Sequence, residues 1–218
     1  MRIPQSMKRL LGNLELSENQ MGRSGDQVLE AGDELVLKIS SHPGSLLREH
    51  QRMTWLQGRL PVPVSLAFER MEGREYHLMT KVPGESLVSP RLLKQPEQVV
   101  DVLVQAMELL KAVDARECPF ASRESTGQEF VHGDLCLPNI LVDRQGRITG
   151  FIDLEACGKG DRWLDVAWAL WSLQYNLGTS RWNQVLLRRL GLGFDEERYL
   201  RYTGEASGSP SGQGKVSL

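Results

Sequence analysis

Three polar residues in the second half of the chain have side chains suited to acid–base and metal chemistry. The triplet His132-Gly133-Asp134 is followed five residues later by Asn139, and Asp153 stands at the end of a short apolar run. A carboxylate such as Asp134 can orient a hydroxyl group and accept its proton. Mg²⁺ takes one or two protein oxygens together with phosphate oxygens, and Asn139 and Asp153 supply two oxygens of the required kind.

The spacing from Asp134 to Asn139 is that of the catalytic loop of protein kinases, where the Asp is the base and the Asn a metal ligand. A loop that leaves a helix and enters a strand can aim Asp134 at a substrate hydroxyl. It can also turn Asn139 toward a metal ion held by Asp153. Each residue alone is an ordinary turn or cap residue, but the combination is rare. The pattern predicts transfer of a phosphoryl group that depends on ATP and Mg²⁺.

Lys38 and Glu49 extend this prediction into the first half of the chain. Lys38 lies in the run LVLKI, where alternation places it opposite Leu37 and Ile39. Glu49 is the only carboxylate between Lys38 and Glu69, and it falls on the next predicted helix. A strand lysine paired with a helix glutamate positions the α- and β-phosphates in kinases. A solvated lysine on a strand is the ordinary alternative.

Composition excludes several other classes of protein. The 218 residues carry a net charge of −2, and no run of Lys and Arg exceeds two residues, so a nucleic-acid partner is not expected. No apolar run has the length of a membrane span, and the N-terminus lacks the pattern of a secretory signal. The three cysteines form no C-x-x-C pair, which favours reduced thiols. We therefore expect a cytoplasmic protein without a membrane partner.

The elements that must position these residues change in kind at Pro83-Gly84. Before this point, short apolar runs and Gly-rich turns predict an antiparallel sheet with one helix. Its strands are expected at 28–29, 35–39, 64–68 and 76–79, and its helix, capped by Ser45, at about 45–60. After it, helices are expected at about 96–110, 164–177, 180–191 and 195–202, with a hairpin at 140–152.

The predicted fold is α+β with two lobes. Residues 1–82 form an N-lobe that binds nucleotide, and residues 83–203 form a mainly helical C-lobe with the catalytic loop and metal site. Residues 204–218 are rich in Gly and Ser and have few apolar side chains to bury, so they are expected to be a disordered tail.

The chain resembles the aminoglycoside phosphotransferase family, bacterial relatives of protein kinases, and within it more closely the 3′-phosphotransferase branch. The resemblance extends from about Gln20 to Tyr199. It is carried by the triplets Cys118-Pro119-Phe120 and Val82-Pro83-Gly84 and by LCLPNI at 135–140. It implies a two-lobe, protein-kinase-like fold and transfer of the γ-phosphate of ATP to the 3′-hydroxyl of an aminoglycoside.

The resemblance also implies residue roles. Asp134 is then the catalytic base, Asn139 and Asp153 bind Mg²⁺, and Asp161 supports the catalytic loop. The loop that contains Arg23, Ser24 and Gly25 resembles the segment whose backbone N–H groups cover the phosphates. The stretch from Thr80 to Val82 matches the hinge whose backbone binds the adenine edge.

The chain departs from the family where the acceptor is bound. Relatives have a substantial helical segment between Cys-Pro-Phe and His-Gly-Asp, and here only residues 121–131 lie between them. That segment and an aromatic-terminated C-terminal tail supply carboxylates to the aminoglycoside site, and this chain has neither. Glu155-Ala156 also stands where the 3′ branch commonly has Gly-Arg. The C-lobe is therefore expected to be truncated.

Several alternatives for the function remain open. The acceptor can be another small hydroxyl compound, such as a macrolide, an amino alcohol or a sugar. The chain can also be a nucleotide-binding pseudoenzyme, an incomplete fragment or the product of an erroneous gene sequence.

Overall fold

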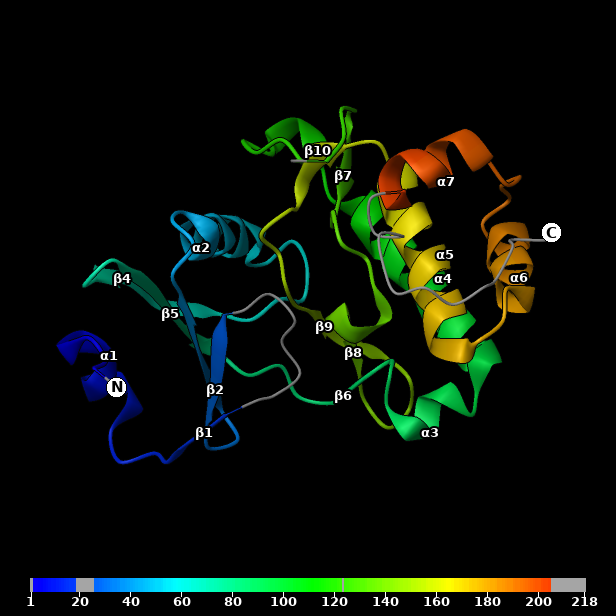
Figure 1. Ribbon diagram of the computed structural model, residues 1–218. Coiled ribbons are helices and arrows are strands. Elements are labelled where there is room, and N and C mark those ends of the chain that lie inside the picture. Colours follow the sequence, from blue (N-terminus) through cyan, green and yellow to red (C-terminus); the bar gives the residue numbers. More distant parts are fainter. Residues whose placement is uncertain (1, 19–25, 123, 205–218) are drawn as a thin grey trace. The chain divides into compact units, whose positions relative to one another are not determined.

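The structure is a computed structural model that describes residues 2–18, 26–122 and 124–204 (Figure 1). By its contacts the chain divides into two compact units. The first comprises Met1–Pro83 and Thr149–Ala156, and the second Gly84–Ile148 and Cys157–Leu218. The segment Thr149–Ala156, which the sequence assigns to the C-lobe, thus groups with the first unit. The predicted tail from 205 onward and the loop residues Arg23, Ser24 and Gly25 lie outside the described residues.

The first unit is built on one antiparallel five-stranded sheet in the order β1-β2-β3-β5-β4. Its elements are α1 (Gln5–Leu11), β1 (Leu16–Glu18), β2 (Gln27–Ala31), β3 (Leu35–Ser40), α2 (Ser45–Leu56), β4 (Ser65–Met71) and β5 (Arg74–Thr80). Glu72 and Gly73 join β4 to β5 with φ of 51° and 75°, as a tight hairpin turn with two left-handed residues requires. The predicted strands and α2 are present, whereas α1 and β1 are additional elements that the sequence did not reveal.

Helix α2 starts in a way that the sequence did not predict. Ser45 is its first helical residue, and the cap position belongs to Gly44, in the left-handed region at φ 83°. Glu75 of β5 takes over the capping role, since its carboxylate accepts the backbone N–H groups of Gly44, Leu46 and Leu47 at 2.8–3.2 Å. A negative charge at a helix N-terminus is favourable. The predicted Ser45 cap was therefore wrong, because a distant carboxylate satisfies these donors.

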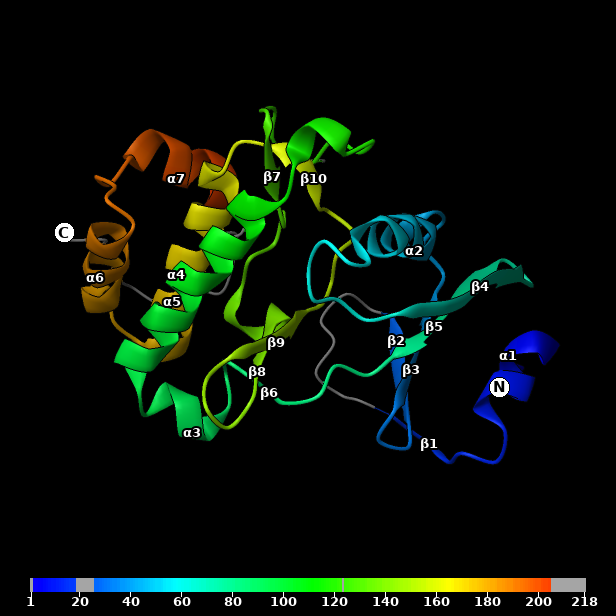
Figure 2. The ribbon, with the colours of Figure 1, turned by 180° about the vertical axis from the view of Figure 1, so that it is seen from behind.

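The second unit is mainly helical. Its elements are β6 (Glu85–Ser86), α3 (Pro90–Leu93), α4 (Pro96–Ala112), β7 (Glu129–Val131), β8 (Ile140–Val142), β10 (Gly158–Gly160), α5 (Trp163–Leu177), α6 (Arg181–Arg189) and α7 (Glu196–Thr203). Strand β9 (Ile148–Phe151) leads the chain back to the first unit. Helix α5 is central and packs against α4, α6 and α7 (Figures 1 and 2). The predicted α+β class, with an antiparallel sheet followed by a mainly helical part, is confirmed.

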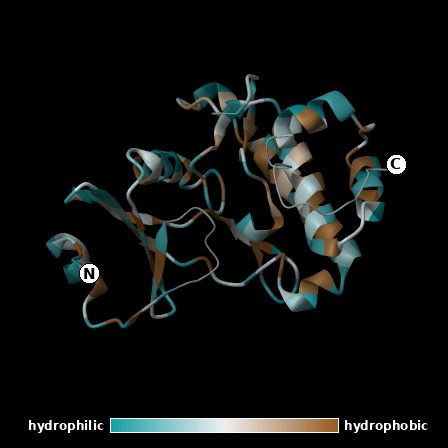
Figure 3. Ribbon diagram, viewed as in Figure 1, coloured by the Kyte–Doolittle hydropathy of each residue, from teal (hydrophilic) through white to brown (hydrophobic). Residues whose placement is uncertain are grey.

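Helix α5 owes its central place to its composition. Nine of its residues are buried, among them the carboxyl-bearing Asp165, and the helix ends at Gly178, which adopts φ 68°. Helices α6 and α7 have mixed polar and apolar surfaces, visible as teal and brown bands in Figure 3, and bury few residues. No helix in the described part of the chain has the length and apolar character of a membrane span.

The short connection before β7 is tightly packed against β10. The backbone N–H of Ser122 donates to the carbonyl of Lys159 at 2.8 Å, and the N–H of Lys159 donates to the carbonyl of Phe120 at 2.9 Å. A side chain at Gly158 would come within 2.7 Å of the Ala121 backbone. The glycines of β10 therefore allow the backbone of Phe120 to Ser122 to pack directly against this strand.

Candidate active site

The catalytic loop lies between β7 and β8, in the second unit. The structure brings Asp134 and Asn139 together there, since the Asn139 Nδ2 donates to the Asp134 carbonyl at 2.9 Å and to its Oδ2 at 3.0 Å. Asp134 is half-buried and Asn139 is buried. Because the amide nitrogen faces Asp134, the amide oxygen of Asn139 remains to coordinate another group. The predicted base and one predicted metal ligand thus form one hydrogen-bonded pair.

Asp165 of α5 holds the loop by its backbone. Its two carboxylate oxygens accept the N–H groups of His132 and Gly133, both at 2.8 Å. Gly133 has φ 86°, a conformation that a residue with a side chain adopts at a cost. Burial raises the pKa of Asp165 to about 7, in opposition to the two N–H groups, which lower it. One carboxylate therefore fixes the two residues that precede Asp134.

The supporting role that the family resemblance implies for Asp161 belongs to Asp165. Asp161 instead accepts the backbone N–H of Trp163, at the start of α5, and the hydroxyl of Tyr202. The sequence did contain a signal for Asp165, because it is a carboxylate within the apolar run WLDVAWAL. A charged side chain on a buried helix face needs buried hydrogen-bond donors.

Ser172 is a second support of the loop that sequence reasoning missed. Its hydroxyl accepts the backbone N–H of Leu137 at 3.0 Å, in a fully buried position. Ser172 lies seven residues after Asp165, two turns further along the same face of α5. One helix face therefore anchors both ends of the catalytic loop.

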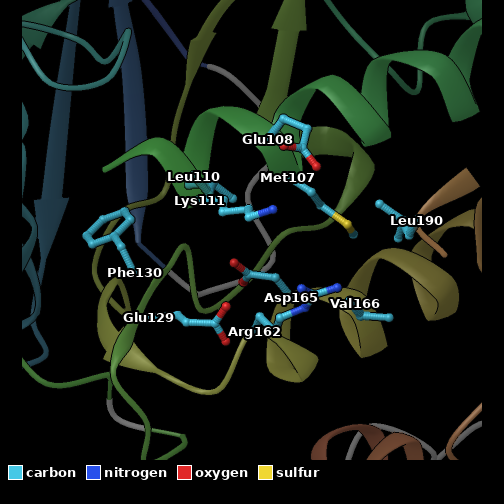
Figure 4. Close-up of a pocket in the computed structure, with 10 residues that line it drawn as sticks. All are labelled: Met107, Glu108, Leu110, Lys111, Glu129, Phe130, Arg162, Asp165, Val166 and Leu190. Atoms are coloured by element: carbon cyan, nitrogen blue, oxygen red, sulfur yellow. The ribbon is translucent and has the colours of Figure 1, made fainter. Parts of the chain in front are cut away.

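A small cavity lies on the other side of Asp165. It has a volume of about 90 Å³ and is bounded by α4, β7 and α5. Figure 4 shows the Asp165 side chain among the lining residues, with Glu129 and Arg162 close by. The carboxylate that supports the loop thus lies between the loop backbone and a charged surface cavity.

The second cluster, in the first unit, joins Lys38 to two carboxylates. Its Nζ lies 2.7 Å from Glu49 Oε1 and 2.5 Å from Asp153 Oδ1. Burial opposes the charge of Lys38, but the attraction of Glu49 and Asp153 outweighs it and raises the pKa of Lys38. Burial likewise opposes the charge of Glu49, but Lys38 and His77 outweigh it and lower its pKa. The predicted Lys38–Glu49 pair is present, and Asp153 joins it.

The position of Asp153 is suited to binding a group from outside the protein. Its side chain is 52% exposed, in contrast to the 3% of Glu49. Its φ of 59° is unusual for a residue other than glycine, and such strain is common at functional sites. Within the described residues no three His, Cys, Asp or Glu side chains gather as a metal site. The exposed carboxylate of Asp153 therefore suits a hard cation that takes its remaining ligands from other oxygen donors.

Glu155, two residues after Asp153, binds the first turn of α2. Its carboxylate accepts the Ser45 hydroxyl at 3.0 Å and the Arg48 Nε at 3.0 Å, and it also pairs with the Arg48 Nη2. Glu155 thus connects the Asp153 segment to α2, the helix that carries Glu49. This contact could not be read from the sequence.

The predicted hinge residues end the sheet of the first unit. Thr80 exchanges backbone and side-chain hydrogen bonds with Val64, at 2.8–3.0 Å. Val82 is 9% exposed, and its side chain contacts the backbone of Gly150, where a Cβ would lie 2.8 Å away. The structure therefore places Thr80 and Val82 at the end of β5.

A comparison with known proteins identifies the chain at the level of family. Residues 16–130 and 126–202 match the model of the phosphotransferase enzyme family. The chain belongs to this family. The two matched segments meet at 126–130, within the short connection that leads into β7.

Curated relatives match this chain over nearly their whole length. The chain is 27% identical to an aminoglycoside 3′-phosphotransferase of Niallia circulans, over 91% of this chain and 94% of the relative. It is 26% identical to an enzyme of the same name from Enterococcus faecalis, over 93% and 96%. The first alignment covers 248 residues, more than the 218 of this chain, so the relative has residues without a counterpart here.

Solved structures of the family show the same fold. An aminoglycoside 3′-phosphotransferase of type VIII superposes with a TM-score of 0.75 at 23% identity, over 90% of this chain and 94% of the other. An aminoglycoside phosphotransferase from Streptomyces rimosus superposes with a TM-score of 0.74 at 21% identity, over 90% and 93%. The predicted family resemblance and kinase-like fold are confirmed.

Proposed function

We propose that this protein transfers the γ-phosphate of ATP to a hydroxyl group of an aminoglycoside, with the 3′-hydroxyl as the expected position. The observation that carries the proposal is the ion network of Lys38, Glu49 and Asp153, because kinases bind nucleotide phosphates with a lysine that is paired with a glutamate. The names of the curated relatives support the acceptor. Related structures contain ADP with streptomycin, and AMP-PNP with hygromycin B.

Each predicted residue has a role in this proposal. Lys38, oriented by Glu49, binds the α- and β-phosphates, and Asp134 orients the acceptor hydroxyl and accepts its proton. Asp153 and Asn139 would hold Mg²⁺, which neutralises phosphate charge when bound. The backbone of Thr80 to Val82 binds the adenine, and that of Arg23 to Gly25 covers the phosphates. Residues 1–82 then form the nucleotide lobe and 83–203 the acceptor lobe.

The use of ATP and the state of the cysteines suggest the compartment in which the protein works. ATP is an intracellular substrate, and the three cysteines are buried and form no disulfide. We place the protein in the cytoplasm, with a small-molecule partner and neither nucleic acid nor membrane as a ligand.

A second candidate acceptor is a less cationic hydroxyl compound. An aromatic stripe on α5, formed by Trp168, Trp171 and Tyr175, lies beside the helix face that anchors the catalytic loop. The Trp171 and Tyr175 rings stack at 5.1 Å, and Tyr175 is 57% exposed. Ring faces bind sugars and apolar rings, whereas ammonium groups are best bound by carboxylates. The aromatic stripe favours this alternative, and so does the lack of the segment that supplies carboxylates to the aminoglycoside site in the family.

A coupled assay of ADP release tests the two acceptor classes side by side. The panel contains kanamycin, streptomycin and hygromycin B as polycations, and macrolides and simple sugars as less cationic hydroxyl compounds. The proposal expects turnover with at least one aminoglycoside and its loss in Asp134→Ala. Turnover confined to the less cationic compounds would select the second candidate. Nucleotide binding without turnover on either class would indicate a pseudoenzyme.

A further inference from the structure

A row of buried polar side chains continues from the Lys38–Glu49 pair to the surface of the first unit. His77 Nδ1 lies 3.5 Å from Glu49 Oε2, and His77 Nε2 lies 2.9 Å from the hydroxyl of Ser65. The same hydroxyl lies 2.7 Å from His50 Nδ1. His77 is fully buried, and His50 and Ser65 are less so. The row therefore begins at the nucleotide side and ends at the partly exposed ring of His50.

The sheet register explains why His77 meets Glu49. His77 of β5 is directly opposite Lys38 of β3 in the antiparallel ladder. Residues opposite each other in a ladder point to the same face of the sheet. Glu49 projects from α2 onto this face and so reaches both side chains.

The hydrogen bonds of Glu49 are incomplete without His77. Lys38 takes one carboxylate oxygen of Glu49, whereas Glu49 Oε2 and His77 Nδ1 have no hydrogen-bond partner within the described residues. Both atoms are buried, and an unsatisfied buried polar atom is costly. They are 3.5 Å apart, so a small rotation of either side chain satisfies both at once.

One arrangement of protons satisfies the whole row. If His77 carries its proton on Nδ1, it donates to Glu49, and its Nε2 accepts from the Ser65 hydroxyl. The Ser65 oxygen then accepts from His50 Nδ1. The opposite tautomer of His77 would leave two acceptors, Nδ1 and the Glu49 carboxylate, facing each other.

We propose that His77 is a positioning residue for nucleotide binding: its Nδ1–H holds Glu49 in the orientation that Lys38 requires, and Ser65 with His50 fixes the tautomer of His77. The proposal rests on the nucleotide-binding part of the proposed function and does not depend on the acceptor. Burial lowers the pKa of His50, which favours the neutral ring that this proton arrangement requires. The groups that face His77 are Lys38, Glu49, His50 and Ser65.

Two substitutions of His77 separate positioning from packing. Asn places its amide near the Nδ1 position and keeps a donor for Glu49, whereas Gln places its amide near the Nε2 position and keeps only the contact to Ser65. Both remove the ring, so they reduce the packing of the same site. His42, whose side chain is 64% exposed, supplies the matched control pair His42→Asn and His42→Gln.

The measurement is the dissociation constant of ADP with Mg²⁺, by calorimetry, with thermal unfolding recorded for each variant. We expect His77→Gln to bind roughly tenfold more weakly than His77→Asn, because a hydrogen bond to a charged group is lost only in the former. Unfolding temperatures of the two variants should be similar, and the His42 pair should match the wild type. Ser65→Ala, at a half-buried position, should weaken binding about threefold without loss of the fold.

The outcomes distinguish failure of this inference from failure of the proposed function. Equal constants for His77→Asn and His77→Gln, or an unchanged constant in Ser65→Ala if the His77 variants do not fold, would overturn the positioning role alone. A wild-type protein that binds neither ADP nor ATP would overturn the proposed nucleotide site and this inference with it.

Discussion

The two units hold their reactive groups by opposite means. In the first unit, Lys38 is held by two carboxylates of which one is buried and the other half-exposed. In the second unit, the loop of Asp134 is held by its backbone, through Asp165 and Ser172. A side chain can therefore be changed at Asp134 without disturbing its supports, whereas a change at Lys38 removes both an active group and a support. This contrast predicts different consequences for binding, turnover and stability.

The largest effect is expected at Asp134. Asp134→Asn should reduce turnover by about 10³-fold, within the range for loss of a general base. It should leave the affinity for ADP unchanged, because the loop backbone keeps its anchors on α5. Steady-state kinetics and calorimetry measure the two quantities, with Asp143→Asn, in the turn after β8, as the control. A matching loss of ADP affinity would show that the loop depends on this side chain.

Lys38→Met should affect binding and turnover together. It removes the phosphate ligand and leaves the buried Glu49 without its cation, so we expect kcat/KM for ATP to fall by about 10²-fold and the protein to be less stable. Lys8→Met, on an exposed position of α1, serves as the control. Kinetics and urea unfolding should be measured on the same preparations. A variant with normal KM and stability would contradict the role of the ion network.

Asp165→Asn should reduce stability more than Asp161→Asn. An amide can accept from only one of the two backbone N–H groups with its oxygen, which leaves the other unsatisfied at a cost of about 1–3 kcal/mol. Asp161 is more exposed and caps the start of α5, so its replacement should cost under about 1 kcal/mol. Urea unfolding at pH 7 compares them. The reverse order would return the supporting role to Asp161.

An effect smaller than that of Asp165→Asn is expected for Glu75→Gln. Burial opposes the charge of Glu75, but the N–H groups at the start of α2 and the Arg70 side chain outweigh it and lower its pKa. Because folding lowers its pKa, ionised Glu75 stabilises the folded state at pH values above the ordinary glutamate pKa of about 4.3. This stabilisation is lost as the pH falls through the pKa that Glu75 has in the folded state. The variant should be less stable by about 1 kcal/mol at pH 7, and this difference should shrink as the pH falls below the ordinary glutamate value. A difference that does not change with pH would contradict this assignment.

The sequence revealed residues that act through a fixed spacing and concealed those that act through a fold contact. Asp134 and Asn139 are five residues apart in one loop, so their pairing was predictable, and Lys38 with Glu49 followed from a strand and the next helix. Asp165, Glu155 and Glu75 act on backbone or side chains 28 to 110 residues away. Their partners depend on how helices and sheet pack, which local patterns do not encode.

Among the helices and strands too, local sequence patterns predicted some elements, and others depend on packing. The apolar spacing of α4 and α5 predicted both, and Gly178 marked where α5 ends. The short α1 and β1 were missed because they have few residues and depend on the sheet core that Met7 and Leu11 join. The cap of α2 was assigned to Ser45 because no local rule points to Glu75.

We propose that the protein still phosphorylates an aminoglycoside although the segment between Phe120 and His132 is short. The most direct test is mass spectrometry of kanamycin after incubation with the protein, ATP and Mg²⁺, with Asp134→Ala as the blank. The account predicts that kanamycin gains one phosphate with the wild type and none with the variant. Unmodified kanamycin, streptomycin and hygromycin B with a wild-type protein that binds ATP would contradict it.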